Sequence, residues 1–365
     1  RAATLSNLFL PIVVSLGSLA TAYALWQGGN SVIGGTHVFG VAMTVGTLTM
    51  FINYTVSFFQ PVRDIARIFA ELQSAQAAAE RVISLLETEP DIVDSPEVVA
   101  QYGDNFHPKT ENWPKLIGDI DFEDVTFRYK EGEKVLEHFK LHIQHGQTIA
   151  LVGETGSGKS TIVNLLCRFY DLRSGSITLT DESGVKHDIT DVTLHSLRSQ
   201  MGIMLQDSFI FSGTILDNIR YGRLDATDDE VRQAAAVVRA DDFIREMPQG
   251  YKTTVNERGG SLSQGQKQLL TIARAMVQDA PILILDEATS SVDTRTEELI
   301  QKAMDALTVG RTSFVIAHRL STIRDADMIL VMNHGDVIER GTHDELLAAG
   351  GFYADLYNSQ FALAD

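Results

Sequence analysis

Cysteine is almost absent from this chain of 365 residues, which contains only Cys167, so no disulfide framework can stabilise it. Because Cys167 lies in an apolar run, we interpret it as a small buried hydrophobic residue rather than a reactive thiol. Basic residues are also scarce: 30 Lys and Arg stand against 48 Asp and Glu, and the formal net charge is −18. This balance argues against a nucleic-acid partner, which would need a basic face. The 10 histidines show none of the spacings expected of a zinc site.

Charged residues are missing from residues 2–62, which contain no Asp, Glu, Lys or Arg. Residues 8–26 form an uncharged run of 19 residues, and residues 38–59 form one of 22. A helix needs about 20 apolar residues to cross the hydrocarbon core of a bilayer. The sequence therefore predicts two transmembrane helices and a multi-pass membrane protein, which we expect in a bacterial inner or plasma membrane.

The basic residues around these runs predict their orientation. Arg1 precedes the first run, Arg63 and Arg67 follow the second, and the connection over residues 27–37 has neither Lys nor Arg. By the positive-inside bias, both ends of the hairpin are cytoplasmic. Two helices cannot enclose a pathway, so further helices must come from elsewhere. The chain begins with Arg1 and shows no signal peptide, so we expect it to start within a longer protein.

Three segments follow from periodicity and composition. Beyond Pro61, apolar residues recur every three or four positions up to Glu87, which predicts that the second helix continues as an amphipathic extension. Residues 88–117 contain 4 of the 8 prolines and resemble a linker. We therefore predict a helical membrane segment over 1–87, a linker over 88–117 and a second domain over 118–365.

The second domain contains a glycine-rich loop, Gly-Glu-Thr-Gly-Ser-Gly-Lys-Ser-Thr, between an apolar strand pattern and an apolar helix pattern. This is the phosphate-binding loop in the context that it requires. Its glycines let backbone N–H groups face phosphates, Lys159 reaches the β- and γ-phosphates, and the Ser160 hydroxyl ligates Mg²⁺. The residues predicted to bind nucleotide here are Gly153, Glu154, Thr155, Gly156, Ser157, Gly158, Lys159, Ser160 and Thr161.

A second motif, Ile-Leu-Ile-Leu-Asp-Glu over residues 282–287, is an apolar strand pattern ending in two acids. Such a strand places acids at the carboxyl edge of a sheet, where ligands of α/β folds bind. We expect Asp286 to support Mg²⁺ and Glu287 to polarise the attacking water. A third motif, Leu-Ser-Gln-Gly-Gln over residues 262–266, precedes a predicted helix, so Ser263 serves either as a phosphate ligand or as an ordinary N-cap.

The remaining patterns predict an α/β P-loop NTPase fold. Short β-branched or apolar runs near residues 139–143, 148–152, 312–317 and 328–332 are typical of strands, and residues 120–129 suggest an edge strand. Helical patterns over residues 228–239, 241–246 and 264–277 predict a helical subdomain inserted into this core.

Taken together, these motifs and their order resemble the nucleotide-binding domain of an ABC transporter. The preceding hairpin and long helix resemble the last two transmembrane helices of an exporter-type (type IV) half-transporter. The resemblance implies an ATPase that binds ATP and Mg²⁺ and couples hydrolysis to export of a drug, lipid or peptide. Lys159, Glu287 and His318 would be catalytic, and Ser160, Gln206 and Asp286 would hold the metal.

The resemblance also implies roles for residues beyond the loop. Tyr129 matches the aromatic residue that stacks on adenine, Gln206 the glutamine that touches Mg²⁺, and His318 the switch histidine at the γ-phosphate. Ser263, Gly265 and Gln266 would serve the nucleotide held by a partner domain, and Asp293 would lie at the dimer interface. Glu257 and Arg258 match the segment that contacts the intracellular helices.

Two departures from the family pattern bear on the partner: Gln264 stands where glycine is usual in the signature, and Asn256 stands at another common glycine position. This variant resembles the catalytically complete subunit of heterodimeric exporters, so we favour a second half-transporter subunit over a second copy. The alternatives are a soluble ABC ATPase, a membrane-tethered regulator that moves no solute, and an exporter-fold importer.

Overall fold

The computed structural model describes residues 2–35, 37–38, 41–130, 135–205, 209–256, 259–286, 294–316 and 323–360. It divides into two compact units, Arg1–Asp91 and Ile92–Asp365. Most of the predicted linker, residues 92–117, therefore packs within the second unit.

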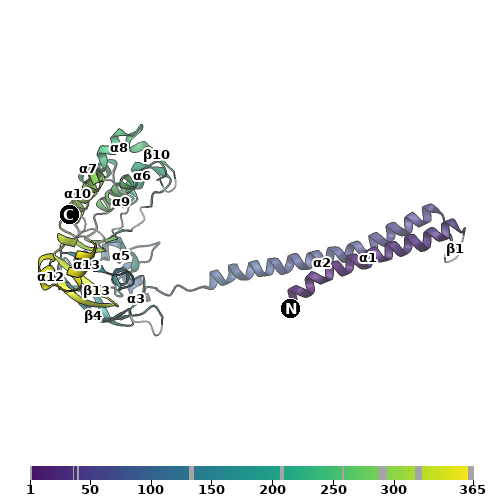
Figure 1. Cartoon of the computed structure of the whole chain (residues 1–365), viewed down its shortest axis with the longest axis horizontal. Helices are drawn as coiled ribbons and strands as arrows, with labels where there is room; N and C mark the ends of the chain where they lie inside the picture. The colour runs from purple at the N-terminus through teal and green to yellow at the C-terminus, as the bar shows by residue number, and fades with distance from the viewer. Residues whose placement is uncertain are drawn as a thin grey trace. The chain divides into compact units, whose positions relative to one another are not determined.

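The first unit is a helical hairpin. Helix α1 (Ala2–Ile33) packs along α2 (Val45–Glu87), and the short strands β1 (His37–Val38) and β2 (Val41–Ala42) pair between them (Figure 1). Thr44 caps α2 reciprocally with Thr47, so the free N–H groups of the first turn are satisfied. Helix α2 has 43 residues and continues through Pro61. It ends at Glu87, where the periodicity predicted its end.

The hairpin exposes much of its apolar surface, including Leu19, Trp26 and Phe58 at 67, 67 and 72% of their full accessible area. Over the described residues, however, no helix combines the length and the apolar content needed to cross a membrane. The transmembrane helices over residues 8–26 and 38–59 thus stay a prediction.

The described part of the second unit contains two large sheets. A six-stranded sheet has the order β14-β13-β5-β12-β11-β8, in which the five strands from β13 to β8 pair in parallel and β14 is antiparallel to β13. Its strands are β5 (Thr148–Gly153), β8 (Met201–Met204), β11 (Ile282–Asp286), β12 (Thr312–Ile316), β13 (Met328–Asn333) and β14 (Asp336–Gly341). The apolar runs predicted as buried parallel strands are confirmed.

Successive side chains of the central strands point to opposite faces of the sheet, and both faces are buried. Ile149 and Leu151 of β5 belong to one hydrophobic cluster, whereas Ala150 and Val152 belong to another on the opposite face. Strand β11 alternates in the same way. A strand covered on both sides has no polar face, which is why these segments read as continuous apolar runs.

An antiparallel sheet of the order β4-β3-β6-β7 packs on one side of this core, with strands β3 (Leu116–Phe127), β4 (Leu136–Ile143), β6 (Ser174–Asp181) and β7 (Lys186–Asp188). The prediction of an edge strand at residues 120–129 is wrong, because β3 lies between β4 and β6. Asp121 and Glu123, which alternate with the buried residues of β3, lie on the solvent side of the sheet.

Helices complete the second unit. The predicted helical subdomain is present as α6 (Ile215–Arg220), α7 (Asp228–Val237), α8 (Ala240–Glu246) and α9 (Gln264–Gln278), with the short pair β9 (Gly213–Thr214) and β10 (Thr254–Val255). Figure 1 shows α7 and α8 at the opposite end of this unit from β4 and α3. The other helices are α3 (Pro96–Tyr102), α4 (Lys159–Leu166), α5 (Leu194–Ser199), α10 (Thr294–Thr308), α12 (His343–Ala349) and α13 (Phe352–Gln360).

The start of the second unit is attached to the end of α4 through a buried ion pair. Arg168, whose side chain is 5% exposed, donates to a carboxylate oxygen of Asp94 over 3.1 Å and to the carbonyl oxygen of Val93 over 3.2 Å. Asp94 also accepts from the N–H of Leu194, over 3.1 Å to each of its oxygens, at the start of α5. The segment before α3 is thereby joined to two helices of the core.

We expect Asp94→Ala to lower the free energy of unfolding of the second unit by about 2–3 kcal/mol, since a buried guanidinium and a helix N–H lose a charged partner. The cost stays below that of a fully orphaned charge, because Arg168 keeps the carboxylate of Asp171 at 3.2 Å. Thermal unfolding of the protein should show a lower midpoint. Asp171→Ala is the matched control: its carboxylate is 48% exposed, and we expect a much smaller shift. Equal shifts for the two variants would contradict the importance of the Asp94 pair.

Candidate nucleotide-binding site

The predicted phosphate-binding loop leads from the carboxyl end of β5 into the first turn of α4. Gly153, Gly156 and Gly158 have positive φ angles of 151, 85 and 104°. A Cβ atom at Gly153 would lie 2.2 Å from the carbonyl oxygen of Met332 on the neighbouring strand β13, so no larger residue fits there. Glycine is required at this position by a close backbone approach as well as by its torsion angle.

Lys159 lies at the start of α4 and is buried, with 9% of its area exposed. Its ammonium group donates to the carbonyl oxygens of Gly153 and Glu154, each over 2.8 Å, and to the Ser157 hydroxyl over 3.3 Å. Burial lowers the pKa of Lys159, and the charge of Asp286 opposes that shift. The lysine that the loop motif predicts therefore lies over the loop and within electrostatic reach of the acid from β11.

The next two residues of α4 differ in exposure. Ser160 is exposed, whereas Thr161 is 5% exposed and its hydroxyl lies 3.1 Å from the hydroxyl of Tyr129. Tyr129 lies two residues beyond the end of β3, so this contact brings the antiparallel sheet to the N-terminus of α4. Two residues predicted to bind nucleotide, from segments 32 positions apart, thus meet beside the loop.

Three aromatic rings gather at this point. The Tyr129 ring lies nearly perpendicular to Phe127, with centroids 4.9 Å apart, and nearly perpendicular to Tyr170, with centroids 5.0 Å apart. Phe127 and Tyr170 also contact each other, at 5.6 Å. Tyr129 keeps 41% of its area exposed, so it remains accessible to a ligand at the loop.

The acid motif is at the same edge of the main sheet. Strands β5, β12 and β11 are parallel neighbours, so their carboxyl ends share one edge, and Asp286 is the last residue of β11. Several other predicted site residues lie outside the described residues: Gln206, Glu257, Arg258, Glu287, Asp293 and His318. For those six, the positions proposed from the sequence stay predictions.

The signature segment forms the start of α9. The hydroxyl of Ser263 accepts from the N–H of Gln266 over 3.2 Å, and the Gln266 side chain accepts from the N–H of Ser263 over 2.9 Å. This capping box is the ordinary N-cap that the sequence left open. Gly265 is buried, while Ser263 and Gln264 are exposed at the helix end, where N–H groups and the helix dipole favour an anion.

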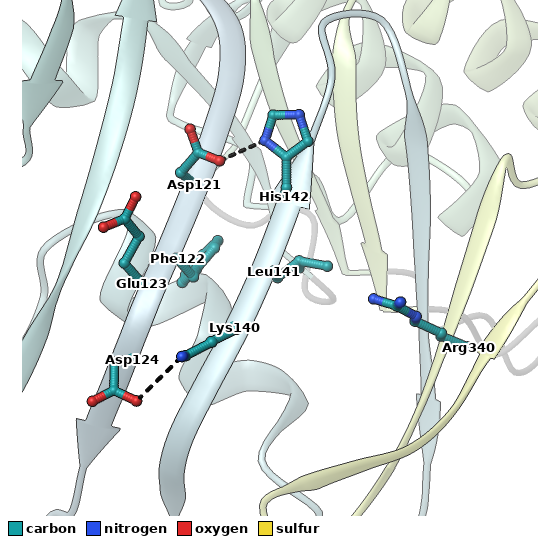
Figure 2. A pocket seen from close by; sticks show the side chains of 8 residues that line it. All are labelled: Asp121, Phe122, Glu123, Asp124, Lys140, Leu141, His142 and Arg340. Atoms are coloured by element: carbon teal, nitrogen blue, oxygen red, sulfur yellow. Dashed lines mark hydrogen bonds and ion pairs between the residues drawn. The ribbon is translucent and has the colours of Figure 1, made fainter.

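The structure also shows a shallow pocket of about 520 Å³ on the outer face of β3 and β4 that the motifs do not predict (Figure 2). Several charges around it are paired: the carboxylate of Asp121 contacts His142 at 2.5 Å and Lys186 at 2.8 Å, and Asp124 lies 4.0 Å from Lys140. Burial works against the charged form of Asp121, but Lys186 and His142 outweigh it and lower its pKa. We interpret this pocket as a solvated row of cross-strand pairs.

Sequence reasoning missed Tyr170 at the site. It follows α4 in a loop, and no periodicity or motif marks it. Cys167, three residues earlier, is fully buried, and burial raises the pKa of its thiol to about 12, which confirms the prediction of a packing residue.

This geometry is that of a P-loop nucleotide-binding domain. Comparison with known proteins shows which family of such domains it resembles. The sequence model of the ABC transporter family matches residues 136–290. The chain is 44% identical over 365 residues to the ABC transporter ATP-binding protein YknV of Bacillus subtilis, covering 100% of this chain and 57% of that protein. It is 47% identical over 349 residues to a fatty acid ABC transporter ATP-binding/permease protein of Mycobacterium bovis, covering 96% of the chain and 51% of the relative.

Two further matches extend the comparison to exporters. An ATP-dependent lipid A-core flippase of Desulfotalea psychrophila is 41% identical over 350 residues, covering 96% of this chain and 57% of the flippase. The solved structure of a bacterial Atm1-family ABC exporter with ATP bound aligns with a TM-score of 0.68 at 36% identity, covering 100% of this chain and 59% of the exporter. The chain therefore contains an ATP-binding domain of the ABC transporter family, and it spans about half to three-fifths of the length of these relatives.

Proposed function

We propose that the chain is part of an ABC exporter subunit that couples ATP binding and hydrolysis to movement of a solute across a membrane. The observation that carries this proposal is one loop geometry: Lys159 lies over the glycine-rich turn, and the charge of Asp286 reaches it from β11. Similarity over the entire chain to ATP-binding/permease proteins and to an exporter with ATP bound supports it.

In this proposal, the residues of the loop and the neighbouring strands divide the work. The N–H groups of residues 153–158 and the start of α4 bind phosphates, Lys159 stabilises charge on the β- and γ-phosphates, and Tyr129 supports the adenine. Glu287 accepts a proton from the attacking water, and His318 donates to the γ-phosphate. Gln206 would contact the metal.

The donor set at the sheet edge fits Mg²⁺. The exposed hydroxyl of Ser160 follows Lys159, and the carboxylate of Asp286 ends β11 at the same edge. Hydroxyl and carboxylate oxygens are the ligands that Mg²⁺ takes beside nucleotide phosphates. Bound there, Mg²⁺ would neutralise phosphate charge; Ser160, Asp286 and Gln206 would hold it.

We further propose that α1 and the first part of α2 lie in a bilayer and that the ATP-binding domain is cytoplasmic. The absence of charge over residues 2–62 and the exposed apolar side chains of both helices support this. Charged residues begin only at Arg63 and continue along α2 to Glu87, as expected of a helix that leaves the membrane. A bacterial inner or plasma membrane fits the relatives.

The partner in this proposal is a second half-transporter subunit. Ser263, Gly265 and Gln266 would face the nucleotide that the partner's loop holds, and Asp293 would lie at the interface. The exposed Gln264 at the start of α9 favours a heterodimer, because it replaces the glycine usual at that place.

The test uses the native membrane assembly that contains this chain, reconstituted into vesicles with the ATP-binding domains outside. We expect Mg²⁺-dependent ATP hydrolysis and ATP-driven accumulation of a fluorescent fatty acid or a lipophilic cationic dye inside the vesicles. Addition of EDTA should stop both. Hydrolysis without movement of either probe would favour a regulator, and ATP-driven loss of probe preloaded into the vesicles would favour an importer.

A further inference from the structure

The loop between α4 and β6 places a second tyrosine beside the ring assigned to the nucleotide base. Tyr170 lies four residues beyond the end of α4, and its ring centroid is 5.0 Å from that of Tyr129, with the planes at 85°. Perpendicular aromatic pairs at this separation attract each other, since the positive edge of one ring meets the negative face of the other.

The contacts of Tyr129 show how its ring is fixed. Its hydroxyl is held at the Thr161 hydroxyl, 3.1 Å away, and its ring contacts Phe127 at 4.9 Å on its own chain segment. Tyr170 is the ring contact that comes from a different segment of the chain. Without Tyr170, the Tyr129 ring would keep its contacts with Thr161 and Phe127 but would lose its support from the loop between α4 and β6.

The loop that carries Tyr170 is itself firmly anchored. Arg168 is buried against Asp94 and Asp171, and Arg198 lies over the Phe169 ring with its guanidinium carbon 4.8 Å from the centroid. Tyr170 is thus presented from a fixed backbone, while 42% of its own area stays exposed beside the nucleotide-binding loop. A ring on a rigid support can hold a neighbour without itself touching the phosphates.

We infer that Tyr170 is a positioning residue for the nucleobase: it orients the Tyr129 ring that supports adenine and thereby contributes to affinity for ATP but not for the phosphate chain alone. This inference deepens the proposed function and rests on it, because it requires Tyr129 to be the base-binding residue.

The test compares binding of ATP with binding of inorganic tripolyphosphate, which has the phosphates but no base, to the native assembly. Tyr170→Ala should weaken ATP binding about two- to tenfold, as expected for loss of one aromatic pair, and leave tripolyphosphate affinity within about twofold. In hydrolysis assays the same variant should raise KM with little change in kcat, since base binding is uniform between ground and transition states.

Three matched variants sharpen this test. Tyr170→Phe keeps the ring and should bind ATP as the unmodified protein does. Tyr129→Ala should weaken ATP binding at least as much as Tyr170→Ala, and the double variant should be no weaker than Tyr129→Ala alone, because one residue acts through the other. Phe106→Ala changes an aromatic residue that is 88% exposed and should have no effect.

Two results would overturn the inference while leaving the proposed function intact. One is equal weakening of ATP and tripolyphosphate by Tyr170→Ala, which would mean that Tyr170 supports the loop as a whole. The other is additive effects of the two alanine variants. If Tyr129→Ala left ATP affinity unchanged, the assignment of the base-binding residue would fail, and the inference with it.

Discussion

Lys159→Ala is expected to reduce ATP turnover by about 10²- to 10³-fold and to weaken ATP binding, because charged hydrogen bonds of about 1.5–3 kcal/mol each are lost at the phosphates. In the structure the Lys159 ammonium group satisfies itself on loop carbonyl oxygens 2.8 Å away. The phosphate chain of ATP offers this ammonium group anionic oxygens in place of the neutral carbonyl oxygens of the loop. The exchange therefore favours the bound state. The measurement is equilibrium binding of ATP followed by steady-state hydrolysis.

Two controls distinguish the loss of the Lys159 charge at the phosphates from an effect of the substitution on folding. Lys140→Ala removes a cation from β4 whose side chain is 72% exposed, and it should leave turnover unchanged. Lys159→Ala should still fold, with an unfolding midpoint without ligand that is lowered by the loss of its bonds to the loop, because the loop keeps the bond from Gly335 to the Ser157 carbonyl oxygen. Unchanged ATP affinity in Lys159→Ala would show that the loop does not bind the triphosphate.

The local sequence was sufficient to predict an element where one physical requirement dominates. The buried strands β5, β11 and β12 could be predicted because a strand covered on both faces has no polar position, and the loop after β5 because phosphate contact needs glycines at fixed spacing. Helices α7 and α9 have Thr227 and Ser263 as their N-caps, each in a capping box that the sequence shows as Ser or Thr three residues before Glu or Gln.

Tertiary contacts account for what sequence reasoning missed. Strand β3 reads as an edge strand in the sequence, yet β6 pairs with it from 47 positions further along the chain, counted from Phe127 at the end of β3 to Ser174 at the start of β6. Asp94 looked like one more acid in a proline-rich linker, and only the fold brings Arg168 to it. Tyr170 is likewise an ordinary loop residue until the ring of Tyr129 is placed beside it.

The signature segment shows how one residue can serve two requirements. The Ser263 hydroxyl caps α9 within the chain, which stabilises the helix by about 1 kcal/mol. The same cap leaves Ser263 exposed at a helix N-terminus, where an anion from another molecule is attracted. The structural and the proposed binding role therefore do not exclude each other, and a sequence pattern cannot separate them.

Glu287→Gln is expected to lower ATP turnover by about 10²- to 10⁴-fold, the usual contribution of a positioned general base. An amide of nearly the same shape cannot accept the proton of the attacking water, so chemistry slows while the contacts of Lys159 and the loop with ATP persist. ATP affinity should therefore remain within about twofold of that of the unmodified protein. Bound ATP should hold the two ATP-binding domains of the assembly together for longer.

Hydrolysis measured in the native assembly, with ATP binding measured beside it, checks this expectation for Glu287. Glu298→Gln is the matched control, because this glutamate is exposed on α10 and the substitution is identical. If Glu287→Gln hydrolysed ATP at an unchanged rate, another group would have to accept the proton. If it lost ATP binding as completely as Lys159→Ala, its carboxylate would be acting on the ground state through Mg²⁺ rather than on the water. The pair of variants thus separates holding the triphosphate, which the loop after β5 performs, from cleaving it, which we assign to the residue after β11.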